Sequence, residues 1–300
     1  MQLIIKSSSY CDFNCSFCSS GKLDIPMTTK VHPKIKKYID EHNFQEIIVN
    51  GGEPLLMSLS WWYDLLDYGS YDLCCISNMM ELYNNTNKVK ELFINPRISF
   101  GASFQDFGGR LYQGKNCSIE WFKEVNKIYY DLCGKSLFFI VVTEDIDNAW
   151  RMLELAQEMD TVCRINPIWP QGLSNSFFPF YKIMKFYLDV IDKGLSEYEK
   201  NVMELKENKC PFSYTKECSK YLRVCYVNSK DELVTYSCDG ISDGGTIENN
   251  VINIECYSCL LHKLCNGCQC TRTFIKRYTP EHCVEMKNLE DRILHAGFAL

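Results

Sequence analysis

The sequence lacks both a long hydrophobic run and a signal peptide, and the two absences limit where the chain can act. Its longest purely apolar stretch, residues 137–142, contains six residues, whereas a membrane-spanning helix needs about 20. Residues 1–7 contain no basic segment followed by an apolar stretch, as a secretory signal would. We therefore expect a cytoplasmic protein that has no membrane partner.

The sequence also lacks an excess of basic residues. It contains 32 Lys and Arg against 38 Asp and Glu, which gives a formal net charge of −6. Proteins that bind bulk DNA or RNA need a basic face to neutralise phosphates, so we expect no such partner. A pocket for a single flipped-out base needs only local contacts and stays an alternative.

Cysteine is the residue that the chain has in excess, with 18 among 300 residues. Because cytoplasmic thiols stay reduced, metal ligation explains this number better than disulfides do. Three of the cysteines fall within residues 11–18, and ten lie between residues 210 and 283. The two clusters predict two separate metal-binding regions.

Between the clusters, short β-rich runs alternate with longer runs of helical periodicity. The predicted strands cover residues 3–6, 46–50, 72–77, 97–103, 137–143 and 162–167, and the helices cover 31–41, 61–68, 87–93, 119–133, 148–159 and 178–191. Six strand–helix units predict an α/β fold with a parallel sheet, closed as a partial (β/α)6 barrel of the TIM type. We expect this barrel over residues 1–195, a linker over 196–209, and a Cys-rich auxiliary-cluster domain over 210–300 that ends in a helix at 284–295.

The first cysteine cluster has the spacing Cys11-x3-Cys15-x2-Cys18 and directly follows the first predicted strand. Three thiolates in one loop can hold three irons of a 4Fe–4S cluster and leave the fourth iron open. A structural cluster or a zinc site needs a fourth ligand, and the sequence offers no good one nearby. The spacing therefore predicts a cluster that binds a further ligand.

With the aromatic Phe17 before its last cysteine, this loop resembles that of the radical S-adenosylmethionine (SAM) superfamily. The resemblance covers residues 1 to about 195. It implies that the open iron binds the amino and carboxylate groups of SAM. An electron from a donor such as flavodoxin or ferredoxin then cleaves SAM to a 5′-deoxyadenosyl radical, and the protein positions the cofactor and excludes water.

Further residues at the ends of predicted strands match motifs of that family. Gly51, Gly52, Glu53 and Pro54 resemble its Gly-Gly-Glu-Pro motif, whose glycines let the backbone approach the ligand and whose polar groups face the SAM ammonium. A plain turn before a helix is the alternative.

Other candidate cofactor-binding residues follow the later strands, because polar residues at the carboxyl ends of barrel strands line the active mouth. They are Asn78, which precedes Met79 where the family has Gly, Ser103, Gln105 where the family has Asp, Thr143 and Arg164. For Ser103, Thr143 and Arg164, a structural role is an equal alternative.

The C-terminal cysteines resemble the SPASM extension of peptide-modifying radical SAM enzymes, which include the anaerobic sulfatase-maturating enzymes. The resemblance implies two auxiliary 4Fe–4S clusters. Their ligands would be Cys218, Cys225, Cys238 and either Cys268 or Cys270 for the first, and Cys256, Cys259, Cys265 and Cys283 for the second. A single auxiliary cluster and a pair of zinc ribbons are alternatives, and the segment between Cys225 and Cys238 is expected to form a hairpin.

These features predict a radical SAM oxidoreductase that modifies a peptide or protein side chain, with auxiliary clusters that accept an electron or bind the substrate. Asp106 and Asp239 are candidates for the catalytic base. Because only ten residues precede Cys11, we expect no N-terminal leader-binding domain, so a separate protein delivers the peptide or the substrate is of another kind.

Two other functions stay open. One is radical modification of a nucleobase, a nucleotide or another small molecule. The other is a non-catalytic zinc-binding interaction module, which would have no use for the motif at residues 51–54.

Overall fold

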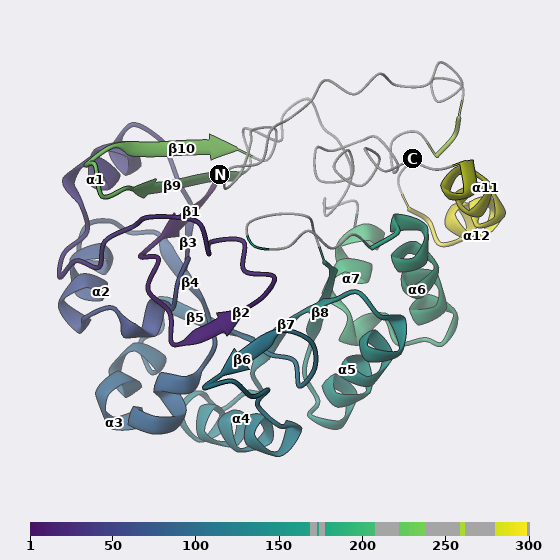
Figure 1. Ribbon diagram of the computed structural model, residues 1–300, viewed down its shortest axis with the longest axis horizontal. Coiled ribbons are helices and arrows are strands. Elements are labelled where there is room, and N and C mark those ends of the chain that lie inside the picture. Colours follow the sequence, from purple (N-terminus) through teal and green to yellow (C-terminus); the bar gives the residue numbers. More distant parts are fainter. Residues whose placement is uncertain (169–172, 174–177, 208–221, 238–258, 262–279, 299–300) are drawn as a thin grey trace.

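The structure, a computed structural model, describes residues 1–168, 173, 178–207, 222–237, 259–261 and 280–298. Six parallel strands form most of its main sheet (Figure 1). In spatial order they are β1 (Gln2–Lys6), β3 (Glu46–Asn50), β4 (Asp72–Ser77), β5 (Ile98–Ser103), β7 (Phe138–Thr143) and β8 (Cys163–Pro167). They lie where the alternating sequence pattern predicts strands, and they confirm the α/β class with a largely parallel sheet.

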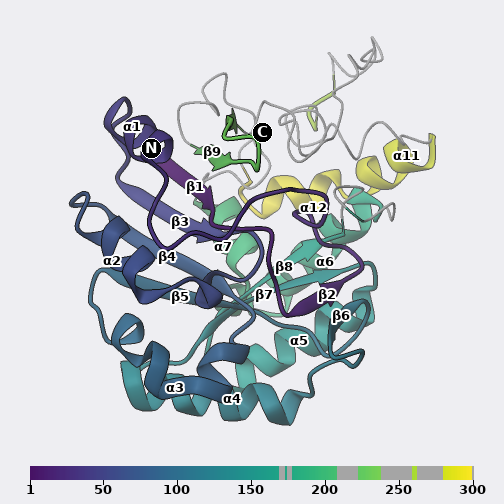
Figure 2. The same ribbon diagram turned by 60° about the vertical axis from the view of Figure 1, so that its left-hand side comes forward.

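Six helices follow these strands and form an arc on the outer side of the curved sheet (Figures 1 and 2). They are α1 (Pro33–Asp40), α2 (Leu59–Leu66), α3 (Met80–Phe93), α4 (Ile119–Cys133), α5 (Ile146–Glu158) and α6 (Phe180–Asp192). Alternate strand residues such as Leu3 and Ile5 are fully buried in the core between strands and helices. Helix α3 starts earlier than predicted, because the non-helical conformation of Asn85 interrupts its periodicity.

A second, two-stranded sheet was not predicted from the sequence. Its strands β2 (Phe13–Cys15) and β6 (Arg110–Tyr112) pair antiparallel, with Cys15 opposite Arg110. Gly109 packs so closely beside this sheet that a Cβ there would lie 1.7 Å from Oγ of Ser16. The pairing holds the loop between β5 and α4 against the cysteine loop.

The expected hairpin near Cys225 is present as β9 (Leu222–Val227) and β10 (Leu233–Ser237), which pair antiparallel. Strand β9 pairs in parallel with β1 and so extends the main sheet. The segment expected as a linker starts with a 3-10 turn, η2 (Ser196–Tyr198), and helix α7 (Lys200–Lys206), which packs against β8.

Two C-terminal helices, α11 (Pro280–Asn288) and α12 (Glu290–His295), occupy the region of the expected terminal helix. Arg292 of α12 forms ion pairs with Asp189 and Asp192 of α6. In the described part of the chain, no helix has the length and apolar character that a membrane span requires.

Candidate active site

A cavity of about 320 Å³ lies at the carboxyl ends of the parallel strands. The predicted site residues that line it are Cys11, Cys15, Phe17, Cys18, Gly51, Gly52, Glu53, Asn78 and Ser103. The fold thus brings the cysteine motif, the Gly-Gly-Glu motif and the ends of β4 and β5 to one place. Pro54 begins the short helix η1 (Pro54–Leu56) behind the cavity and does not line it.

The three thiols of the cysteine loop are half-buried in the cavity wall. Burial raises the pKa of Cys11 to about 12 and also raises that of Cys15, although the charge of Arg110 opposes the rise at Cys15. Protonated thiols must lose their protons to bind metal, so metal loading and deprotonation would be coupled.

The donor set of the cysteine loop is compatible with an iron–sulfur cluster. Three thiols line one cavity, and three cysteines that each bind a different iron leave one iron of a 4Fe–4S cluster open. In the described ranges, no group of three His, Cys, Asp or Glu side chains is arranged as a site for a metal ion.

The two glycines of the motif allow a close approach between protein segments. Gly51 and Gly52 have φ angles of 80° and 55°, which favour glycine. A Cβ on Gly52 would lie 2.2 Å from the carbonyl oxygen of Tyr10, and the next N–H, of Glu53, donates to that same oxygen at 2.8 Å. The glycines thus let the loop after β3 pack on the residue that precedes Cys11.

Glu53 joins two loops of the cavity. Its carboxylate accepts hydrogen bonds from the N–H of Leu55 (2.9 Å), the hydroxyl of Ser77 (2.6 Å) and the N–H of Asn78 (2.8 Å). The side chain is 2% exposed, and its burial raises its pKa to about 7 against the effect of these hydrogen bonds. The glutamate that the motif predicts to face a ligand is thus also a brace between β3 and β4.

The loop after β4 contacts the cysteine loop directly. The amide of Asn78 donates to Oδ1 of Asp12 at 2.6 Å, and its own Oδ1 accepts from the N–H of Met80. Met79 has a φ of 66° and is fully buried. This chain therefore keeps the left-handed backbone that glycine adopts easily, with a methionine side chain in the core.

A second cavity, of about 410 Å³, adjoins the first and shares Phe17, Val142 and Ile168 with it. The predicted residues Gln105 and Thr143 line this second cavity. Gln105 is 1% exposed, and its Oε1 accepts from the N–H of Val142 at 3.0 Å, which ties β5 to β7. Thr143 exchanges hydrogen bonds with the backbone of Asp145 at the start of α5.

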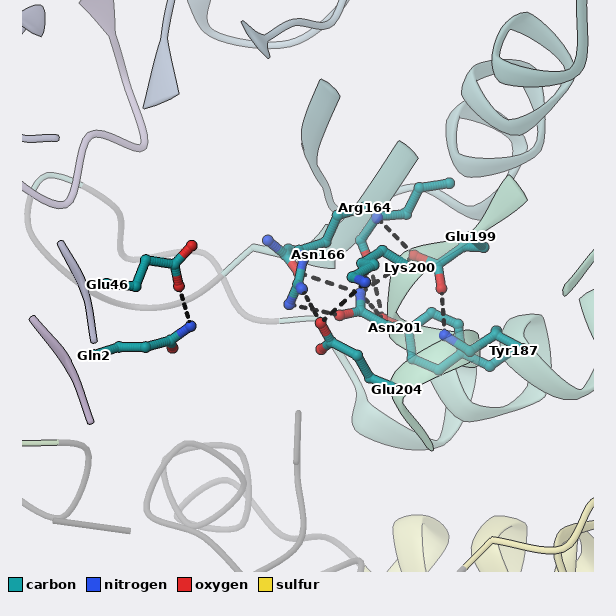
Figure 3. A network of polar contacts seen from close by, with 11 residues as sticks. Gln2, Glu46, Arg164, Asn166, Tyr187, Glu199, Lys200, Asn201 and Glu204 are labelled. Carbon is teal, nitrogen blue, oxygen red and sulfur yellow. Dashed lines mark hydrogen bonds and ion pairs between the residues drawn. The ribbon is translucent and has the colours of Figure 1, made fainter. Parts of the chain in front are cut away.

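Besides Pro54, the predicted residues Asp106 and Arg164 lie outside both cavities. Asp106, a candidate base, forms an ion pair with Arg151 of α5. Arg164 bonds to Asn201 at 3.3 Å and pairs with Glu204, both on α7 (Figure 3). Arg164 lies two residues before Asn166 on β8, a separation of about 7 Å along the strand. Of these two residues, Asn166 lines the first cavity and Arg164 does not. Arg164 therefore serves the contact between β8 and α7.

The described auxiliary cysteines differ in their surroundings. Cys225 is fully buried in the hydrophobic core, and burial raises its pKa. Cys259 and Cys283 are half-buried. The remaining predicted residues, Cys218, Cys238, Asp239, Cys256, Cys265, Cys268 and Cys270, lie outside the described residues.

Six further polar residues that the sequence did not single out line the first cavity, namely Lys6, Ser19, Ser20, Asn50, Arg110 and Asn166. Lys6 is 6% exposed, and its Nζ donates to Oγ of Ser20 at 3.1 Å. The alternation of side chains along β1 could have predicted the position of Lys6, because Leu3 and Ile5 face the helices and Lys6 lies on the opposite face of the strand. Arg110 has no such signal, since its strand is only three residues long.

Comparisons with known proteins support the architecture. The fold is similar to that in the crystal structure of Streptococcus suis SuiB, with a TM-score of 0.55, 15% sequence identity, and coverage of 93% of this chain and 75% of that one. At this identity the likeness establishes the fold alone. No family model matches the sequence, and no match was found among curated proteins.

Proposed function

We propose that this protein is a radical SAM oxidoreductase that modifies a side chain of a peptide or protein. One observation carries the proposal. Cys11, Cys15 and Cys18 line the same cavity as the Gly-Gly-Glu motif, at the carboxyl ends of the barrel strands, where barrel enzymes have their active sites.

In this function, Cys11, Cys15 and Cys18 would hold a 4Fe–4S cluster, which with SAM would supply the radical chemistry. The protein's part is to position and to seal the site. Glu53 and Asn78 fix the loops after β3 and β4 against the cysteine loop, and Phe17 forms a wall shared by the two cavities.

The peptide or protein substrate is proposed from the C-terminal cysteine spacing, which resembles that of peptide-modifying enzymes. The second electron of a net oxidation would pass to an auxiliary cluster, with Cys259 and Cys283 as half-buried candidate ligands. Flavodoxin or ferredoxin would deliver the first electron.

The test is cleavage of SAM to 5′-deoxyadenosine by anaerobically reconstituted, reduced protein. We expect the Cys11/Cys15/Cys18→Ala variant to lose this activity, while Cys133→Ala, which removes a half-buried thiol at the end of α4, keeps it. Undiminished cleavage by the triple variant would contradict the proposal.

The iron content tests the auxiliary clusters separately. Three 4Fe–4S clusters would give about 12 irons per chain, of which about 8 remain in the triple variant. About two zincs with almost no iron in that variant would refute auxiliary clusters and leave the N-terminal one unaffected.

The substrate class is tested by oxygen-free mass spectrometry of candidate peptides and nucleotides before and after incubation with the enzyme. The loss of two hydrogens from a peptide supports the proposal. A mass change confined to a nucleotide would favour modification of a nucleobase.

A further inference from the structure

Arg110 places a positive charge in the wall of the first cavity, beside the cysteine loop. It belongs to β6, directly opposite Cys15 of β2. Its guanidinium lies over the ring of Phe17, at 5.3 Å from the ring centroid. The short two-stranded sheet and this ring contact together hold the side chain on the side of the cavity where Cys15 lies.

No carboxylate forms an ion pair with Arg110 within the described part of the chain, although Asp12 brings a negative charge to the same cysteine loop. Arg110 takes part in none of the ion pairs found there, and its buried Nε has no hydrogen-bond acceptor among the described groups. The charge nonetheless lies beside the cysteine loop, because Arg110 is opposite Cys15 in the two-stranded sheet and its guanidinium lies over the ring of Phe17. Its effect on a cluster held in this loop would therefore be electrostatic.

A cation beside a cluster favours the state with the more negative charge. The reduction potential of an iron–sulfur cluster depends on the net charge, hydrogen bonding and solvent exposure around it. In a partly buried site, the effective dielectric is well below that of water, so a nearby unit charge interacts with a cluster more strongly than it would in water. A fixed, unpaired arginine is thus a strong determinant of how easily a cluster there takes up an electron.

We propose that Arg110 is a positioning residue whose charge raises the reduction potential of the cluster held by Cys11, Cys15 and Cys18. This inference rests on the proposed function, because it needs a cluster at these cysteines. It assigns to Arg110 the task of making the cluster reducible by a cellular electron donor, apart from any contact with the substrate.

The experiment is a redox titration of the reconstituted protein, followed by electron paramagnetic resonance. The relevant signal is the one that is absent from the Cys11/Cys15/Cys18→Ala variant. For Arg110→Met, which keeps the apolar stem but not the charge, we expect reduction to become at least about tenfold less favourable, a downward shift of about 59 mV for a one-electron couple. Arg110→Lys keeps the charge and should stay closer to the wild-type potential.

The chain offers a matched control in Arg151, which stacks over Phe107 at 5.5 Å and lines neither cavity. Arg151→Met removes a similar arginine–phenylalanine contact and should leave the potential unchanged. If Arg110→Met takes up less iron than the wild type, Arg110→Gln is compared with Arg110→Lys, so that the charge is again the main difference.

The outcomes separate the inference from the proposed function. If the reduction potential of the cluster is the same with and without the Arg110 charge, the inference is wrong and the proposed function is unaffected. A wild-type protein that shows no signal dependent on Cys11, Cys15 and Cys18 contradicts the proposed function instead.

Discussion

Two buried glutamates, Glu53 at the first cavity and Glu199 at the edge strand β8, have similar surroundings in different parts of the molecule. Glu53 caps η1 and Glu199 caps α7, and each accepts hydrogen bonds from two backbone N–H groups. They are 2% and 0% exposed, and burial raises the pKa of each to about 7.

Their neighbours differ. The carboxylate of Glu199 accepts from the N–H of Ile165 at 2.8 Å. It thus bonds to an N–H of the edge strand β8 that would otherwise be free to pair with a further strand. Glu53 instead joins two loops beside three thiols. A buried carboxylate with a raised pKa is therefore no mark of catalysis by itself, and the cysteines distinguish the two regions.

The largest effect in this comparison is expected at Gly52. Alanine there would put a Cβ 2.2 Å from the carbonyl oxygen of Tyr10 at a φ of 55°, so the cysteine loop must move. For Gly52→Ala we expect loss of the N-terminal cluster's iron and at least about tenfold slower SAM cleavage, a cost of about 1.4 kcal/mol or more. Wild-type iron content and cleavage would show that the close approach is dispensable.

Alanine variants of the two glutamates test whether Glu53 and Glu199 contribute similarly to stability but differently to function. Glu53→Ala and Glu199→Ala each leave two buried N–H groups without their acceptor, at about 1–3 kcal/mol per group. Urea denaturation should show that both variants are destabilised. Only Glu53→Ala should also weaken SAM binding, and equal SAM binding by both would remove the functional difference between the regions.

The pH dependence of stability should reflect both carboxylates. Their pKa values rise from 4.5 when exposed to about 7 in the folded protein. The folded state therefore binds more protons in this window, and stability falls as pH rises through it, by at most about 1.4 kcal/mol per pH unit for each group. The free energy of unfolding at several pH values should have a shallower slope in Glu53→Gln and in Glu199→Gln. An unchanged slope in both variants would show that these two carboxylates do not cause the pH dependence of stability.

The smallest effect on iron content and SAM cleavage is expected at Gly194, between α6 and η2. Its φ is 72°, but a Cβ there would meet no heavy atom within 4 Å. Gly194→Ala should therefore cost only the backbone strain, about 1–2 kcal/mol, with no change in iron content or SAM cleavage. A loss as severe as that of Gly52→Ala would show that strain, rather than the contact with Tyr10, explains both.

The sequence by itself determined where the barrel strands lie along the chain and which residues form the cysteine loop. The predicted strands at residues 46–50 and 72–77 coincide with β3 and β4, because alternate burial leaves a local pattern of period two. The spacing of Cys11, Cys15 and Cys18 is equally local, and it predicts iron–sulfur chemistry without reference to any distant residue.

Only the tertiary structure decided which distant segments meet. The pairing of β2 with β6 places Arg110 opposite Cys15. The pairing of β9 with β1 buries Cys225. Arg164 bonds to α7 and does not line the first cavity. Periodicity reports that one side of a segment is buried, but not which partner buries it. Very short strands such as β6 carry too few residues for even that signal, so the environment of the site depends on long-range packing.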